Sequence, residues 1–515
     1  MSNTQKTYGR TTILANYTEK EILGADEKRL DEIIIDILEK SFPIHLQNKT
    51  DSQYLKAFYY GDQDIKFKEK QTRENINNKT VENWAYALIQ FKEAYLLGKP
   101  IQYVQLNNSG EEEISLLNRF VRYENKKAKD MELYEDVLVC GRGFRYVNKD
   151  PEGTTDDAPF ELINCDFDNT EVVYSSKLGK EQLLSYIETS MQENYTVVDE
   201  HGEEVVKTND YTEYTVYLRD RQLVYSDKSG TLTRVGDAKP LLWNEHIIQE
   251  YFINRKRISL IELGKDLFND INYLESLDKD DMEQFVNAIM VFTNATVTEE
   301  DIDAIKELGA VSINSTEQKK ASVDLLQGRL NATDTQTYYN RLLNSLHQIL
   351  GVPMASDNGT VINGDTGQAR LTGQGYTSAG IRAETDETMF GMCDYRSLKV
   401  ILEICKQSNS IKNLKVSDIE SKFQRDMSDN LLVKTQGLMN LYACDIPRKY
   451  ANSIVNLFSD PHAVTEEQQK LFGNQTSQQS GNSSNNGGDT TSQDNKANEQ
   501  NNQITNITQK DEQGQ

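Results

Sequence analysis

The sequence predicts an α+β protein in which a mixed helix–strand region precedes two long helices that flank a small insert. Apolar residues recur every three or four positions over Leu260–Phe292 and again over Asp334–Leu350, as in amphipathic helices. Short apolar runs separated by turn signals fill residues 136–255 and favour strands. The second helical pattern stops at Gly351-Val352-Pro353, where glycine and proline mark a C-terminal end.

The composition limits the classes of function. The 515 residues carry a net charge of −25, which argues against a nucleic-acid binder that reads sequence, because such a protein needs a basic surface. It does not argue against a surface past which DNA slides, since like charges repel phosphate. No apolar run approaches the ~18 residues that span a bilayer, and the first residues lack the apolar core of a signal peptide. We therefore expect a cytoplasmic protein with no membrane segment.

The N-terminal third is expected to begin with a polar, flexible arm over residues 1–29. A first helix is predicted around Leu30–Leu38, and residues 45–80 are predicted to form a charged loop. A basic cluster in this loop could touch nucleic acid, although a solvated surface loop is the favoured interpretation. The cluster consists of Lys66, Lys68, Lys70 and Arg73.

The next segments alternate between helices and strands. A helix over Asn83–Leu97 should end at Gly98-Lys99-Pro100 and pass into a strand at Ile101–Leu106, and a second helix should cover Glu111–Glu135. Gly141-Arg142-Gly143 is interpreted as a hairpin turn, because it has only two glycines of a dinucleotide fingerprint. The predicted strands are Val137–Val139, Phe144–Val147, Phe160–Ile163, Glu171–Tyr174, Leu184–Ile187, Tyr211–Arg219, Gln222–Tyr225 and Ile247–Ile253.

The C-terminal third begins with a polar, glycine-rich loop at Met354–Gly367. A helical region follows over residues 368–407. A last globular piece, Leu414–Phe472, should hold a strand at Ser421–Phe423 and helices near Leu431–Tyr442 and Arg448–Phe458. From Gly473 onward the composition is polar and is typical of disorder.

The sequence shows no catalytic constellation. The five histidines are never four residues apart, and no complete phosphate loop, HExxH or GxSxG occurs. His347 lies between Leu346 and Leu350, where a packed or interface histidine is expected. The five cysteines are widely spaced and odd in number, so reduced thiols are expected. We therefore expect no enzyme, cofactor or metal site. The alternative is a soluble enzyme with an unrecognised site in residues 136–255.

One side of the first long helix is acidic. On pattern alone, a helical hairpin in an ordinary core with a solvated acidic face is favoured over a stalk that carries a head. The acidic residues are Glu262, Asp266, Asp270, Glu275, Asp278, Asp280, Asp281 and Glu283.

Several stretches resemble the portal proteins of tailed double-stranded DNA bacteriophages, of the type found in siphophages. Their order and spacing over Glu69–Phe472 make the resemblance specific. These stretches are NWAYALIQFKEAYLLGKPIQ at 83–102, YEDVLVCGRGFRY at 134–146, the long pattern at 260–292, ILGVP at 349–353, GDTGQA at 364–369 and YRSLKVIL at 395–402.

The resemblance implies a multidomain portal-type subunit with a mixed wing, a long-helix stem, a small α/β clip and a helical crown. About twelve such subunits would form a ring around a central tunnel through heterologous contacts. The implied parts are a flexible arm (1–29), wing (30–256), first stem helix (257–292), clip (293–333), second stem helix (334–353), tunnel loop (354–367), long wing helix (368–413), crown (414–472) and disordered polar tail (473–515).

The resemblance also implies a virion protein at the capsid portal vertex, which is present in the host cytoplasm during assembly. Its partners would be double-stranded DNA bound without sequence preference, the large terminase subunit, the major capsid protein, a scaffolding protein and a head–tail adaptor. A head–tail connector or scaffold without a motor-docking role is the closest alternative.

Four groups of residues are expected to carry these roles. The acidic stem residues that would line the channel are Glu262, Asp266, Asp270 and Glu275. The apolar stripe expected to meet neighbouring subunits is Leu267, Ile271, Leu274 and Phe285. The clip would dock partners through Lys319 and Lys320. The tunnel loop would face DNA with Asp357, Asn358, Thr360, Asn363, Asp365 and Thr366.

Overall fold

The computed structural model divides the chain into two compact units, Met1–Asp426 and Met427–Gln515, which are described separately. The residues described are 8–70, 75–106, 111–150, 157–198, 204–286, 289–293, 322–326, 332–354, 376–424, 431–444 and 446–455, with a few further positions up to 468. Residues 294–321 of the predicted clip, residues 355–367 of the tunnel loop and the tail at 473–515 therefore lie outside the described residues.

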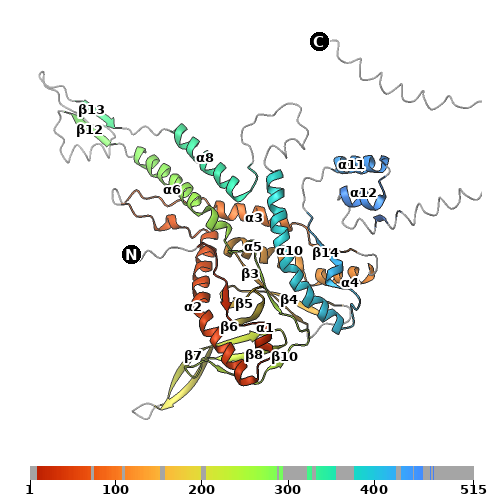
Figure 1. Ribbon diagram of the computed structural model, residues 1–515. Coiled ribbons are helices and arrows are strands. Elements are labelled where there is room, and N and C mark those ends of the chain that lie inside the picture. Colours follow the sequence, from red (N-terminus) through yellow and green to blue (C-terminus); the bar gives the residue numbers. More distant parts are fainter. Residues whose placement is uncertain are drawn as a thin grey trace, which may run out of the picture. The chain divides into compact units, whose positions relative to one another are not determined.

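The first unit contains a seven-stranded sheet (Figure 1). Its only parallel pair is β1 with β5, and β6 and β7 form a long hairpin. Helix α2 (Glu27–Tyr59) packs Ile33, Ile37 and Leu38 against Val173 and Tyr186 of this sheet. The strands are β1 (Ile13–Ala15), β5 (Thr170–Ser175), β6 (Gln182–Val198), β7 (Glu204–Tyr217), β8 (Arg221–Ser226), β9 (Thr233–Arg234) and β10 (Lys239–Pro240).

A three-stranded sheet in the order β11–β3–β4 forms the centre of the first unit. Helices α3, α5 and α10 bury their apolar faces around it in one continuous core. A short pair, β2 with β14, joins residues more than 300 positions apart. The elements are α3 (Trp84–Leu97), β2 (Gln102–Gln105), α4 (Glu111–Tyr123), α5 (Lys126–Cys140), β3 (Gly143–Lys149), β4 (Phe160–Cys165), β11 (Ile248–Tyr251), α10 (Tyr376–Gln407) and β14 (Ile419–Lys422).

Two long helices lie side by side and lead to a small strand pair (Figure 1). They are α6 (Leu260–Val286) and α8 (Ala332–Leu350), and the strands are β12 (Ile289–Thr293) and β13 (Ser322–Leu326). The helix predicted to reach Phe292 ends at Val286, so this part of the prediction is wrong. The last residues, Ile-Met-Val-Phe-Thr, are β-branched or aromatic apart from methionine, and they pair antiparallel with β13.

Other predictions about the first unit are wrong for physical reasons that the structure shows. Residues 8–29 are not a flexible arm, because β1 pairs with β5 and Thr18 caps the short helix α1 (Glu19–Leu23). Helix α2 continues through the expected loop as far as Tyr59. The helix predicted over Glu111–Glu135 breaks at Asn125, which has a left-handed φ of 51°.

The segment around Gly141 is a helix end rather than a hairpin turn. Val137–Val139, predicted as a strand, form the last turns of α5. Gly141 then ends the helix with a φ of 84°, a conformation that glycine adopts without a Cβ clash. A Cβ at this position would lie 2.0 Å from the carbonyl oxygen of Arg257, so the turn also permits a close approach of the segment that starts α6.

The predictions that rested on local stop signals are confirmed. Helix α3 starts after Asn83, whose side chain accepts a hydrogen bond from the Tyr86 N–H, and it ends at Gly98. Helix α8 ends at Gly351, where φ is 69°. In the second unit, α11 (Leu431–Ala443) and α12 (Arg448–Val455) occupy the predicted places, and Tyr442 donates a hydrogen bond to Asn452 between them. None of the described helices is long and apolar enough to cross a membrane.

Candidate functional site

The N-terminal end of α6, which we call its root, is held by a capping box. The Ser259 hydroxyl accepts a hydrogen bond from the Ile261 N–H at 3.0 Å, and the Glu262 carboxylate accepts one from the Ser259 N–H at 2.8 Å. The other Glu262 oxygen accepts from the Gly9 N–H and from the Arg10 guanidinium. Glu262, predicted to line a channel, is therefore engaged inside the subunit, at the start of the helix.

The N-terminal segment reaches the same root. Arg10 is buried between Glu262 of α6 and Asp51 of α2. Gly9 has a φ of 85°, and a Cβ there would lie 2.1 Å from the carbonyl oxygen of Lys256. Gly9 and Arg10 thus join α2 to the beginning of the first long helix.

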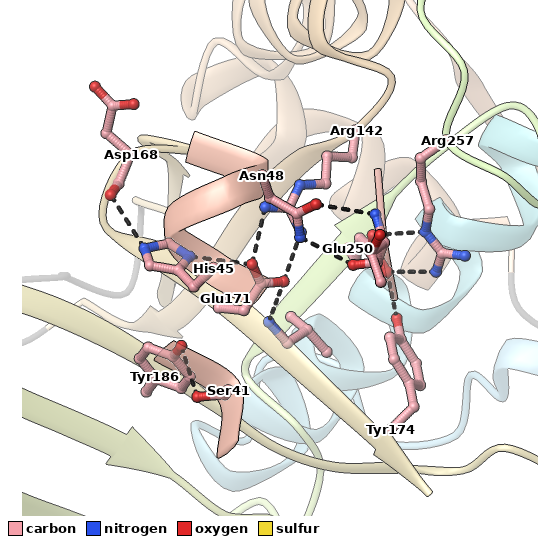
Figure 2. A network of polar contacts seen from close by, with 12 residues as sticks. Ser41, His45, Asn48, Arg142, Asp168, Glu171, Tyr174, Tyr186, Glu250 and Arg257 are labelled. Carbon is pink, nitrogen blue, oxygen red and sulfur yellow. Dashed lines mark hydrogen bonds and ion pairs between the residues drawn. The ribbon is translucent and has the colours of Figure 1, made fainter. Parts of the chain in front are cut away.

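A network of buried ion pairs joins residues of β5, β11, α2 and the segment before α6 (Figure 2). Arg257 donates to Glu250 of β11 at 2.9 and 2.7 Å, and Tyr174 of β5 donates to the same carboxylate at 2.8 Å. Arg142, in the turn after α5, pairs with Glu171 of β5 through two hydrogen bonds of 2.5 and 2.8 Å. The network therefore connects β5, β11 and the α5–β3 turn to Arg257, three residues before α6 begins.

His45 of α2 belongs to the same network, 3.1 Å from Glu171. Burial alone would lower the pKa of His45, but Glu171 and Glu188 raise it to about 9. Burial alone would raise the pKa of Glu171, but Arg142 and His45 lower it to about 2. Both groups are charged at neutral pH and neutralise each other, so this arrangement fixes geometry and does not poise a proton for transfer.

A strap formed by residues 62–83 runs along α6, and residues 71–74 within it are outside the described part. The N–H groups of Asn78, Thr80 and Glu82 donate to three side chains of α6 at 2.6, 3.0 and 2.8 Å. The acceptors are Asp280, Ser276 and Asn272 in that order. Two residues of extended chain advance ~6.6 Å and four residues of helix ~6.0 Å, so alternate strap residues meet every fourth helix residue.

Asp280 is the main anchor of the strap. Lys68 and Lys70 each place Nζ 3.1 Å from one of its oxygens, and the other oxygen accepts from Asn78. Burial opposes ionisation, but these hydrogen bonds and cations hold the pKa of Asp280 well below its usual value. Lys68 and Lys70 are thus committed to α6, which corrects the favoured interpretation of this part of the basic cluster as a solvated surface loop.

A third joint fixes the C-terminal end of α8. Arg382 of α10 donates to the carbonyl oxygens of Ile349 and Gln348 at 2.5 and 3.0 Å, which satisfies two acceptors in the last turn. His347 packs edge-on against Trp84 of α3, which confirms the expectation of a packed histidine. The N-terminal end of α6 and the C-terminal end of α8 are therefore tied to the rest of the first unit by side chains from other elements.

The residues of α6 that were predicted to carry function differ in how far they are exposed. Ile271 is fully buried, and Leu267 and Leu274 pack against the subunit's own core, so the apolar stripe already has a partner inside the chain. Asp266 and Asp270 are exposed, whereas Glu275 is half-buried and its pKa is raised by burial and by Glu82 and Asp278. The side chains of Phe285, Lys319, Lys320 and the tunnel-loop residues are outside the described part.

The described residues contain no group of three or more His, Cys, Asp or Glu side chains that could hold a metal ion. All five cysteines are free thiols. The polar clusters at the start of α6, around Glu171 and along the strap consist of paired charges whose partners come from distant parts of the sequence, so these clusters act as structural joints.

Comparison with known proteins identifies the family. The model of the family described as "Phage portal protein, SPP1 Gp6-like" matches residues 38–506, nearly the whole chain. A search of curated proteins gave no match. Because the match covers nearly the whole chain, including both long helices and most of the second unit, the chain belongs to the SPP1 Gp6-like family of phage portal proteins.

Proposed function

We propose that the protein assembles as a closed ring of about twelve subunits at one capsid vertex, where heterologous contacts between identical copies close the circle. The ring forms the channel through which DNA is packaged and later ejected. The observation that carries this proposal is the family match over residues 38–506. The paired helices α6 and α8, anchored at the joints described above, support it because they are suited to act as a rigid stem.

The channel function also agrees with the charge of the chain. A net charge of −25 disfavours adhesion of DNA phosphates, and each additional phosphate contact would add a salt-dependent holding term that opposes movement. We place the tunnel loop, 354–367, next to the DNA. In this proposal Asp357 and Asp365 limit adhesion there, while the neutral residues Asn358, Thr360, Asn363 and Thr366 make weak contacts that ignore sequence.

The protein is structural in this scheme, and the energy for packaging comes from a partner. The large terminase subunit docks on the clip, 293–333, with Lys319 and Lys320 among the contacts, and a head–tail adaptor replaces it after packaging. The capsid and scaffolding proteins contact the outer parts of the ring. Its location is then the portal vertex of the virion.

The proposal can be tested by complementation. A phage that lacks the gene for this protein infects a host that carries the gene on a plasmid. The wild-type gene should restore DNA that is protected from nuclease inside particles. A chain in which residues 294–321 are replaced by a short turn should still form rings but should give no protected DNA, because the motor cannot dock. Normal packaging with that chain would contradict the clip assignment. Normal packaging without the gene would contradict the function itself.

A further inference from the structure

A group of three tyrosines forms an exposed aromatic surface where α2 ends beside α3. Tyr59 is buried, and the rings of Tyr60 and Tyr86 lie against it with centroid distances of 5.0 and 5.1 Å. Tyr60 is 68% exposed and Tyr86 is 45% exposed. Two large aromatic rings are thus held in place by a third and remain open to solvent.

Two carboxylates are linked to Tyr59 by hydrogen bonds, Glu135 directly and Glu93 through Gln90. Glu135 of α5 accepts a hydrogen bond from the Tyr59 hydroxyl at 3.1 Å. The Gln90 amide donates to Glu135 at 3.2 Å, to Glu93 at 3.1 Å and to the Tyr59 hydroxyl at 2.9 Å. A single neutral side chain therefore holds two acidic groups together next to the Tyr59 hydroxyl.

The carboxylate pair lacks a neutralising cation within the described part of the chain. No described lysine, arginine or histidine forms an ion pair with Glu93 or Glu135, while the nearby Lys56 pairs with Asp136 and Lys92 pairs with Asp386. Burial and the neighbouring charge of Glu135 raise the pKa of Glu93 to about 7. This contrasts with the α6 root and the strap anchor, where each buried carboxylate meets a cation.

We propose that the tyrosine–glutamate patch, formed by Tyr59, Tyr60, Tyr86, Glu93 and Glu135, is a docking site for an arginine or lysine side chain of a partner protein. Aromatic faces attract such cations, and the carboxylates linked to Tyr59 supply the missing opposite charge. This inference goes beyond the proposed ring and channel and does not depend on them.

Other ligands fit the patch less well. Nucleic acid would bring phosphates toward two carboxylates, which repel them. A metal ion needs oxygen or nitrogen acceptors pointing inward, but the Gln90 amide N–H groups already occupy the space between the carboxylates. An apolar side chain would cover the rings but would leave the acidic pair without a counter-charge. A cation on a long apolar stem satisfies both features.

The test uses the full-length protein in its isolated oligomeric form and a heptapeptide with one central arginine between glycines and serines. Saturation-transfer NMR reports which peptide protons contact the protein. We expect transfer to the arginine side chain, and roughly fivefold less when citrulline, which is uncharged and of the same shape, replaces arginine.

Variants assign the binding to the patch. Tyr86→Ala and Glu135→Gln should each reduce the transfer by about fivefold, whereas Tyr86→Phe should retain it because the ring remains. Glutamine at position 135 can still accept the bonds from Tyr59 and Gln90, so folding is preserved. Matched controls are Tyr123→Ala, an exposed tyrosine elsewhere, and Glu32→Gln, an exposed glutamate on α2.

The outcomes separate the possibilities. Equal transfer to the arginine and citrulline peptides would overturn the proposal, because it would show that charge is not recognised. Equal losses in the patch variants and the controls would also overturn it, because they would show only a general attraction to an acidic protein. Size-exclusion chromatography of each variant should give the elution volume of the wild type. A failure of ring formation in the wild type would contradict the proposed function but not this inference.

Discussion

At the scale of single residues, Glu93 is a carboxyl group whose ionisation opposes folding. Its pKa is about 7 in the folded protein, compared with the ordinary value of 4.5, because of burial and the adjacent Glu135. Between these values the folded state keeps a proton that the unfolded state has released, so stability falls as pH rises from 4.5 to 7. Glu93→Gln should therefore raise the melting temperature above that of the wild type more at pH 8 than at pH 5. The same difference at both pH values would contradict this assignment, and Glu32→Gln serves as the exposed control.

Ionisation of Asp280 favours folding, whereas ionisation of Glu93 opposes it. Its hydrogen bonds from Asn78 and its cations hold the pKa below the ordinary value of 3.8, so it contributes stability at neutral pH that is lost as pH falls below the unfolded value. Asp280→Asn should destabilise the folded protein at pH 7 by on the order of 2 kcal/mol and should release the strap. Trypsin should then cleave after Lys66, Lys68 or Lys70 several times faster. The neighbouring exposed carboxylate in Asp281→Asn should leave cleavage unchanged, and equal rates in both variants would show that the strap is held in another way.

At the scale of elements, Arg382 joins α10 to the last turn of α8. Arg382→Ala removes the partners of two carbonyl groups, so that turn should open more readily. Amide hydrogen exchange at Leu346–Leu350 should accelerate roughly tenfold, the effect of ~1.4 kcal/mol of lost local stability. Lys399→Ala, farther along the same helix, is the control. Unchanged exchange in the Arg382 variant would mean that packing alone holds this end.

The same elements show what the sequence can and cannot predict. Helices α3 and α8 were predicted correctly because their ends carry local signals, such as Gly98 and Gly351. The end of α6 was predicted wrongly because the pairing of β12 with β13 decides it. The break at Asn125 was not predicted because a left-handed backbone conformation produces it. The capping box of Ser259 and Glu262 was readable as Ser-x-x-Glu and was missed.

The candidate site was less predictable than the fold. The strap contacts join residues about 200 positions apart, and neither partner has a local signature. The acidic residues of α6 looked equivalent in the sequence. In the structure Glu262 caps the helix, Asp280 anchors the strap, and Asp266 and Asp270 face solvent. Periodicity identifies a helix face, but only the packing of other elements decides which carboxylates remain free.

At the scale of the whole molecule, assembly must use surfaces that remain exposed on the subunit. Ile271 is buried in the subunit's own core, so Ile271→Asp should unfold the chain and cannot report on assembly. Leu263 and Tyr273 are about half exposed on α6. The double variant Leu263→Ser with Tyr273→Ser should therefore retain the circular dichroism spectrum of the wild type but shift the oligomer toward monomer in analytical ultracentrifugation. An unchanged oligomer would place the contacts on other parts of the chain.

This chain belongs to the portal family, and we propose that it forms a closed ring. Native mass spectrometry of the purified full-length protein tests it most directly, because the mass of one 58.8 kDa chain fixes the number of copies in the assembly. We expect a single dominant species of about twelve copies, the closed ring that heterologous contacts produce. A protein that remains monomeric at high concentration, or a ladder of open oligomers without a dominant size, would contradict it.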